Sequence, residues 1–186
     1  MKLRVRFFIS VHTIKQTVAN NLFAVNQKVI IAHTTFMKIK YFISTGAVII
    51  VAALGALFTQ FGMEWYDILI KPSQWIPSFI IPIAWAIIYL SFIVALILWQ
   101  IRKPLTVENI VLLAINGVLN VLWCLVFFTL KSLFIGNVII VVNVLFAIRL
   151  LFEICKESSV YGLWLSIYPI WLSVAVTLNM AVWILN

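Results

Sequence analysis

Residues 65–89 read WYDILIKPSQWIPSFIIPIAWAIIY, a polar, proline-rich stretch that runs directly into an apolar segment of membrane-spanning length. It contains three tryptophans, two tyrosines and three prolines. Proline disfavours the interior of a regular helix, and tryptophan and tyrosine combine apolar surface with a polar atom. We therefore predict that residues 62–78 form an ordered loop that covers a ligand pocket.

The composition excludes a soluble domain. Of the 186 residues, 65% are hydrophobic and 10% are charged, and the mean hydropathy is +1.18. A helix of about 20 residues at about 1.5 Å per residue spans a hydrocarbon core of about 30 Å. The apolar segments of this length are 42–61, 79–101, 109–130, 133–154 and 161–185. We predict an all-α integral membrane protein, a bundle of five transmembrane helices.

The charge is distributed unevenly along the chain. Residues 1–40 carry seven Lys and Arg and no acidic residue, whereas the other six basic residues face five acidic ones. The body therefore has no basic patch for nucleic acid. Because basic residues favour the cytoplasmic side, we expect a cytoplasmic N-terminus and a first loop on the opposite side.

This asymmetry separates a basic N-terminal extension, residues 1–40, from a membrane domain, residues 41–186. The extension has the composition of a targeting peptide or a membrane-surface segment. Alternatively, Met37 is the natural start of the chain, and residues 1–36 precede the mature protein. Both interpretations stay open at this point.

Three predicted helices carry polar and aromatic residues at helical spacing, so that each set shares one face. The sets are Trp85 and Tyr89; Asn116, Asn120, Trp123 and Phe127; and Trp164, Tyr168, Trp171, Ala175 and Asn179. Amide groups are costly in hydrocarbon, which favours inward-facing sets. Together with Trp75 of the loop, they predict a pocket for a large, flat, mostly apolar ligand.

A purely structural interpretation also accounts for each residue singly. Asparagine often links neighbouring membrane helices, small residues such as Ala175 mark close helix contacts, and tryptophan near a helix end often lies at the membrane surface. We assign Trp99 and Trp183 to that interface. Several rings on separate helices, next to the Trp/Pro loop, favour the pocket.

Residues for conventional catalysis or metal binding are scarce. Both histidines lie in the extension, and Cys124 and Cys155 are too far apart in sequence to suggest a metal motif, so we interpret them as packing residues. We expect no metal site and no acid–base or nucleophilic catalysis.

The motifs resemble a known family. WYDILIKPSQWIPSFIIPIAWAIIY resembles the signature WYxxLxKPxWxPPxxxFPxxWxxLY of the TspO/MBR family of translocator proteins, also called peripheral-type benzodiazepine receptors. LNVLWCLVFF resembles LNLLWSxxFF of that family, and YPIWLSVAVTLNMAVWILN resembles PYxxWxxFAxxLNxxIxxLN. The resemblance covers residues 41–186. The chain departs from it at Gln74, at the single Pro77 and at Cys124, and its helix-five proline is displaced to Pro169.

The resemblance implies a five-helix bundle, commonly a homodimer in a bacterial cell membrane, that binds porphyrins such as protoporphyrin IX and requires no cofactor. The matching pocket residues are Tyr66, Trp85, Asn120, Trp171, Ala175 and Asn179. In some bacterial members, the tryptophans that match Trp85 and Trp171 are linked to light-dependent breakdown of porphyrin.

Three functions follow as hypotheses. The first is a tetrapyrrole-binding membrane protein that transports, senses or scavenges porphyrin. The second is oxidative photodegradation of the bound porphyrin through Trp85 and Trp171, which is the only catalysis that this sequence favours. The third is a structural membrane subunit without a ligand.

Overall fold

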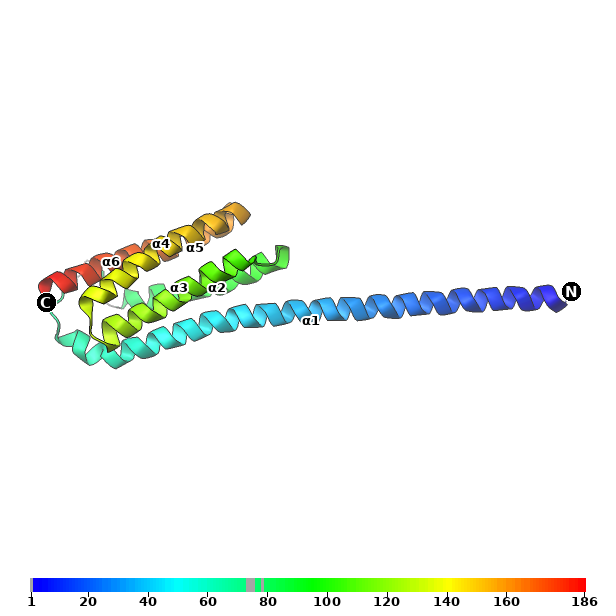
Figure 1. Ribbon diagram of the computed structural model, residues 1–186, viewed down its shortest axis with the longest axis horizontal. Coiled ribbons are helices and arrows are strands. Elements are labelled where there is room, and N and C mark those ends of the chain that lie inside the picture. The colour runs from blue at the N-terminus through cyan, green and yellow to red at the C-terminus, as the bar shows by residue number, and fades with distance from the viewer. Residues whose placement is uncertain (1, 73–75, 78) are drawn as a thin grey trace. The chain divides into compact units, whose positions relative to one another are not determined.

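The computed structural model describes residues 2–72, 76, 77 and 79–186, and only the backbone of residues 2–19, 33, 36 and 37. The described chain is helical, with short connections and no strand (Figure 1). The helices are α1 (Lys2–Ile68), α2 (Ile80–Arg102), α3 (Val107–Cys124), the π-helix η1 (Leu125–Thr129), α4 (Leu133–Glu157), α5 (Ser159–Leu165) and α6 (Ile167–Leu185).

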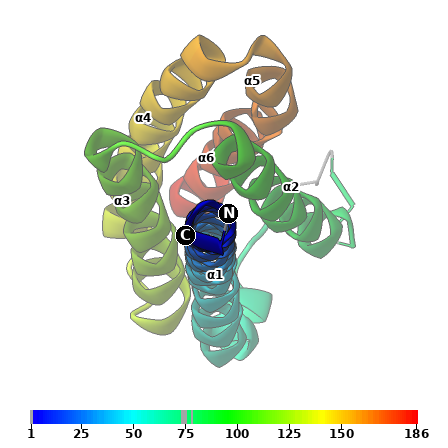
Figure 2. The same ribbon diagram turned by 90° about the vertical axis from the view of Figure 1, so that its right-hand side faces the viewer.

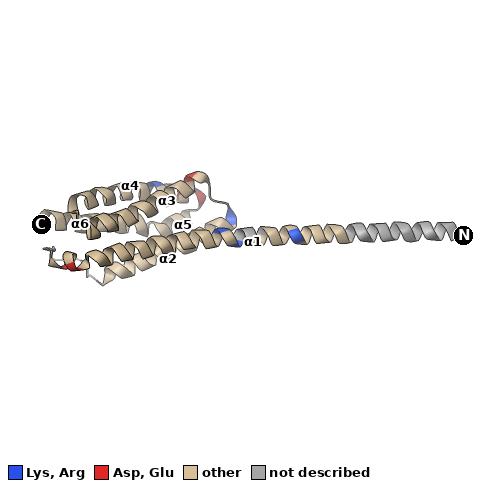
Figure 3. Cartoon of the chain, turned by 60° about the horizontal axis from the view of Figure 1, so that its bottom comes forward, with Lys and Arg blue, Asp and Glu red and all other residues tan. Residues whose placement is uncertain are grey.

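Five described helices are long and apolar enough to cross a membrane, which confirms the predicted all-α, five-helix membrane protein. These spans are Lys38–Ile68, Ile80–Arg102, Val107–Thr129, Leu133–Glu157 and Ser159–Leu185. In residues 43–186, the charged positions gather toward the ends of the helices (Figure 3). The hydrocarbon core of a bilayer matches the uncharged middle of such helices.

The chain divides into two compact units, residues 1–42 and 43–186. In the first unit, residues 2–42 are helical, and many of the described side chains are exposed apolar ones, Leu22, Phe23 and Val29 among them. The second unit is the helical bundle, and it contains every residue of the predicted site.

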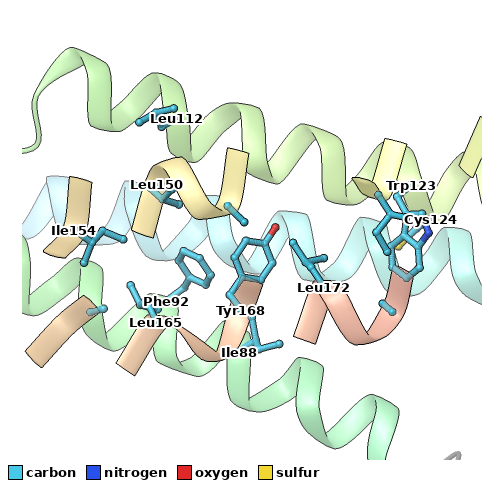
Figure 4. Packing of buried hydrophobic residues seen from close by; sticks show 14 of the residues in the cluster. Ile88, Phe92, Leu112, Trp123, Cys124, Leu150, Ile154, Leu165, Tyr168 and Leu172 are labelled. Atoms are coloured by element: carbon cyan, nitrogen blue, oxygen red, sulfur yellow. The ribbon is translucent and has the colours of Figure 1, made fainter. Parts of the chain in front are cut away.

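Helix α4 packs against α3, α5 and α6, and α2 packs against α5 and α6 (Figure 2). The core between them is apolar and aromatic (Figure 4). Within residues 43–186, hydrogen bonds at two positions of α1, Ser44 and Phe58, help to join it to this bundle. Gln100 Nε2 donates to Ser44 Oγ at 2.9 Å, and Thr129 Oγ1 donates to the Phe58 carbonyl at 2.8 Å.

The π-helix η1 makes the tight turn from α3 into α4. The Leu130 amide donates to the Leu125 carbonyl at 2.8 Å, and Lys131 has a left-handed φ of 58°. A π-helical turn is wider than an α-helical one, and such turns often occur at functional sites. It buries two consecutive rings, Phe127 and Phe128, which are 0% and 9% exposed.

Pro169 interrupts the last transmembrane segment. Proline has no amide hydrogen, so the Leu165 carbonyl loses its usual partner four residues later. Helix α5 ends at Leu165 and α6 begins at Ile167, with Ser166 between them.

Three sequence-based assignments are wrong. The loop predicted at 62–78 is helical through Ile68, because its prolines begin only at Pro72 and nothing before them stops α1. Trp99, assigned to the membrane surface, is only 3% exposed. Conversely, Trp164, expected on the inward face, is 54% exposed. Cys155 is exposed as well, but its Sγ packs against Gly162, which agrees with its assignment as a packing residue.

Candidate functional site

A stack of aromatic rings joins α2 to α3. Trp85 and Tyr89 lie one turn apart on α2, and their ring centroids are 5.7 Å apart with planes 27° apart. Trp85 also stacks on Trp123 of α3, at 6.0 Å and 29°. Trp123 is buried and Trp85 is half-buried. The structure thus brings two predicted site residues from different helices into direct contact.

The ring cluster continues toward the end of α1. The Trp123 ring lies 5.8 Å from the Phe128 ring, which lies 5.4 Å from the Tyr66 ring. Tyr66 also contacts Phe127, at 6.2 Å. Tyr66 lies on helix α1, whereas the sequence predicted it in the loop. The phenylalanines of η1 connect its ring to Trp123.

Beside these rings is a polar cluster. The Tyr89 hydroxyl donates to Asn120 Oδ1 at 3.1 Å. Gly55 of α1 lies next to this pair. A Cβ built on it would lie 3.7 Å from the Tyr89 hydroxyl, 3.8 Å from Asn120 Oδ1 and 3.5 Å from Cys124 Sγ. Cys124 is buried, as predicted for a packing residue. The three distances from the Cβ are ordinary van der Waals distances, so α1 lies next to these polar groups and a methyl group at position 55 would fit there.

Tyr168 of α6 extends the polar cluster to α4. Its hydroxyl lies 3.4 Å from Asn143 Oδ1, to which it donates, and it also lies close enough to Asn120 to interact with it without a regular hydrogen bond. Its ring packs edge-on against Phe92, at 5.1 Å (Figure 4). Helices α1, α2, α3, α4 and α6 therefore all contribute to one polar centre within an apolar bundle.

Four predicted site residues present buried N–H groups that have no hydrogen-bond partner among the described residues. They are Asn120 and Asn179, through Nδ2, and Trp123 and Trp171, through Nε1. A buried donor without a partner costs about 1–3 kcal/mol. Since each of these groups is a donor, a ligand that pairs with them must carry hydrogen-bond acceptors.

Helix α6 carries three of the predicted residues on one face, at intervals of four. Trp171 is half-buried, while Ala175 and Asn179 are 8% and 6% exposed. The backbone carbonyl of Asn179 accepts a bond from Asn137 Nδ2 of α4, at 3.3 Å. This face points into the bundle, as its spacing predicted, and Ala175 is the small side chain between two larger ones.

Other buried amides hold helices together. Asn116 Nδ2 donates to the Leu112 carbonyl at 2.8 Å and to the Phe146 carbonyl of α4 at 3.3 Å. The structural interpretation therefore fits Asn116 and Asn137. Sequence reasoning overlooked Asn137 and Asn143, although asparagines inside an apolar run were a signal for buried polar contacts.

Trp75 lies outside the described residues, so its predicted place in the loop has no structural counterpart. In the part of the chain that the structure does describe, no group of three or more His, Cys, Asp or Glu side chains is arranged to hold a metal ion. One connected cluster, formed by side chains of α1, α2, α3 and η1, contains four predicted residues: Tyr66, Trp85, Asn120 and Trp123.

The sequence is similar to known proteins over most of this bundle. The family model described as "TspO/MBR family" matches residues 44–184. Protein CrtK of Rhodobacter capsulatus is 34% identical over 139 residues, which cover 72% of this chain and 84% of that protein. The tryptophan-rich protein TspO of Chlorobaculum tepidum is 32% identical over 145 residues, 76% and 92% of the two chains. The chain is a multi-pass membrane protein that belongs to the TspO/MBR family.

Proposed function

We propose that this protein binds a porphyrin-type tetrapyrrole within the bundle, in the manner of a transporter, sensor or scavenger. The observation that carries the proposal is the set of four unpartnered, buried N–H groups on Asn120, Trp123, Trp171 and Asn179. They lie on α3 and α6, and the two of α3 adjoin the ring cluster of Trp85, Trp123 and Tyr66.

A porphyrin has the matching chemistry. Its macrocycle offers a flat apolar face for the indole and phenol rings, and aromatic pairs contribute about 0.5–1.5 kcal/mol beyond their buried area. Its carboxylate side chains are acceptors for the unpaired N–H groups, and hydrogen bonds to a charged group contribute about 1.5–3 kcal/mol. Family membership points to the same class of ligand.

The test is a titration of the detergent-purified protein with protoporphyrin IX in the dark, followed by porphyrin absorbance and tryptophan fluorescence. Replacing Trp123 by Phe keeps a ring and removes the N–H. The matched control is Trp99→Phe, which also removes a buried, unpartnered indole N–H. Trp99 lies near the C-terminal end of α2, whereas Trp85, which stacks on Trp123, lies near its N-terminal end.

We expect saturable binding that Trp123→Phe weakens about tenfold, with little change for Trp99→Phe. Absence of saturable binding by the unaltered protein refutes the proposal and leaves the structural membrane subunit as the favoured function. Equal losses from both variants refute the assignment of the site.

A second candidate function is light-dependent oxidation of the bound porphyrin by dioxygen, through Trp85 and Trp171. The stack of Trp85 on Trp123 favours it, because closely stacked indoles can share a positive charge. Three results together would support this function. The unaltered protein loses the porphyrin absorbance band under light but not in the dark, and Trp85→Phe and Trp171→Phe still bind porphyrin but do not lose the band. Equal bleaching in all three proteins excludes it.

The placement in the cell is part of the proposal. Arg149 pairs with Glu108 and Glu153, and Lys103 pairs with Glu157, at the end of the bundle where α2 and α4 finish. With Arg102 and Lys156, this end carries more basic residues than the other and is proposed to face the cytoplasm. We propose a homodimer in a bacterial cell membrane; chemical cross-linking in nanodiscs tests the dimer, and labelling of the exposed Cys155 from either side tests the orientation.

A further inference from the structure

Asn186, directly after α6, is bonded to the backbone of Ile70, in the segment that follows α1. Its Oδ1 accepts from the Ile70 amide at 3.0 Å, and its Nδ2 donates to the Ile70 carbonyl at 2.9 Å. The same Nδ2 donates to the Val182 carbonyl at 2.8 Å, which satisfies a carbonyl in the last turn of α6. One carboxamide therefore joins the end of α6 to both backbone groups of a single residue.

This pairing is specific to a carboxamide. It requires an acceptor for one backbone group and a donor for the other, on one planar group. Aspartate keeps the acceptor but has no donor when ionised, and alanine has neither. Two substitutions at position 186 can therefore separate the bond to the Ile70 amide from the bond to its carbonyl.

The segment that Asn186 holds is coupled to the candidate site. The Leu69 amide donates to the Tyr66 carbonyl at 3.3 Å, and Leu69 and Tyr66 both pack against the core. Lys71 bonds Asp67 at 2.9 Å, and its ammonium lies 4.5 Å from the centre of the Tyr66 ring. Fixing Ile70 therefore restrains the surroundings of Tyr66.

The other end of the contact belongs to the site face of α6. Ala175, Asn179, Val182 and Asn186 follow one another at intervals of four, three and four, so they share one side of the helix. The first three are buried. The face that carries two predicted ligand residues thus ends in the residue that binds Ile70.

We propose that Asn186 is a positioning residue, which keeps the segment Leu69–Pro72 against the end of α6 and so controls the passage of ligand into and out of the candidate site. The pair opens when ligand enters or leaves and is closed when ligand is held. This inference rests on the proposed function, because it needs a ligand in the same site.

The experiment uses the full chain in nanodiscs, with three variants: Asn186→Ala, Asn186→Asp and the control Ile184→Ala, whose side chain is 76% exposed on the same helix end. Two quantities are measured. Hydrogen–deuterium exchange followed by mass spectrometry reports on peptides that contain the Ile70 amide. Stopped-flow mixing gives the association and dissociation rates of protoporphyrin IX, and circular dichroism checks that each variant is folded.

We expect Asn186→Ala to speed both exchange at Ile70 and porphyrin dissociation about tenfold, and to speed association as well, since a passage that is open more often helps both directions. Asn186→Asp should raise exchange less than Asn186→Ala, because it retains an acceptor for the Ile70 amide, and Ile184→Ala should change neither quantity.

Unchanged exchange in Asn186→Ala shows that the carboxamide does not hold the segment and overturns the inference. Faster exchange with unchanged porphyrin rates overturns the control of ligand passage, as does a change in porphyrin rates without faster exchange. Absence of binding by the unaltered protein refutes the proposed function and the control of passage with it, while the exchange measurement still decides whether Asn186 holds Ile70.

Discussion

Tyr89 of α2 donates its hydroxyl to Asn120 Oδ1 of α3, at 3.1 Å, inside a bundle whose core is otherwise mostly apolar. Asn120 is only 2% exposed, and its Nδ2 already has no partner among the described residues. The hydrogen bond from Tyr89 therefore gives the buried Asn120 side chain a partner for its oxygen, and an unpaired amide would be costly in hydrocarbon.

Replacing Tyr89 by Phe leaves Asn120 Oδ1 without its donor and keeps the stack on Trp85. We expect a loss of about 1–3 kcal/mol in unfolding free energy, the cost of a buried unpaired polar group, measured as a lower melting temperature in detergent. Tyr161→Phe is the control, because its ring lies against Arg102 and the substitution leaves that contact in place. Equal melting temperatures for Tyr89→Phe and the unaltered protein would contradict this account.

Gly62 allows α1 to touch η1. A Cβ at this position would lie 2.2 Å from the Phe128 carbonyl oxygen, a backbone atom that cannot rotate away. Gly62→Ala should therefore destabilise the bundle by about 1–3 kcal/mol, the usual cost of overpacking, or more.

The matched control is Gly46→Ala on the same helix, where a Cβ meets nothing within 4 Å. There the helix propensity of alanine should act alone and stabilise the protein by up to about 1 kcal/mol. Thermal unfolding of both variants distinguishes the effects, and a stable Gly62→Ala protein would show that α1 and η1 are not in close contact.

Thr129 forms a hydrogen bond between helices, and Thr177 forms one within a helix. Thr129 Oγ1 donates to the Phe58 carbonyl of α1, whereas Thr177 Oγ1 donates to the Val174 carbonyl of its own helix. We expect Thr129→Val to cost about 1 kcal/mol and Thr177→Val to cost much less. Chemical denaturation in detergent measures both, and the reverse order would argue against the contact of α1 with η1.

Ala175 separates Trp171 from Asn179 on the site face of α6. A leucine there adds three carbons among buried groups, and we expect it to weaken protoporphyrin IX binding about tenfold or more by occupying ligand space. Thr177→Leu, on the exposed side of the same helix, is the control and should bind normally. If Ala175→Leu binds porphyrin with unchanged affinity in the same titration, the ligand does not reach this face of α6.

Much of the candidate site followed from spacing alone. In a helix, residues three or four positions apart share a face, so Asn120 with Trp123, and Ala175 with Asn179, were expected to point the same way, and all four are buried. The structure adds which face meets which: Trp85 lies on Trp123, and Tyr66 is reached through Phe128. Such partners depend on the packing of helices that are distant in sequence.

Local rules were least informative where tertiary contacts compete with them. Trp99 was assigned to the membrane surface because it lies near a helix end, yet packing against neighbouring helices buries it. Residues 62–68 were assigned to a loop because prolines follow, yet the helix continues through them, and Gly62 rests against Phe128. For Trp99 a contact between helices decided the outcome, whereas residues 62–68 continue the helix because no proline occurs before Pro72.

The sequence by itself determined the membrane setting, the five spans and the inward faces of the helices, because these depend on hydropathy, length and helical period, which are local properties. Only the tertiary structure decided that Asn186 binds the backbone of Ile70, that η1 widens into a π-turn, and that five helices share one polar centre around Asn120. The physical reason is that hydrogen-bond pairing and close packing are set by the distances between helices, and these appear only once the helices are assembled.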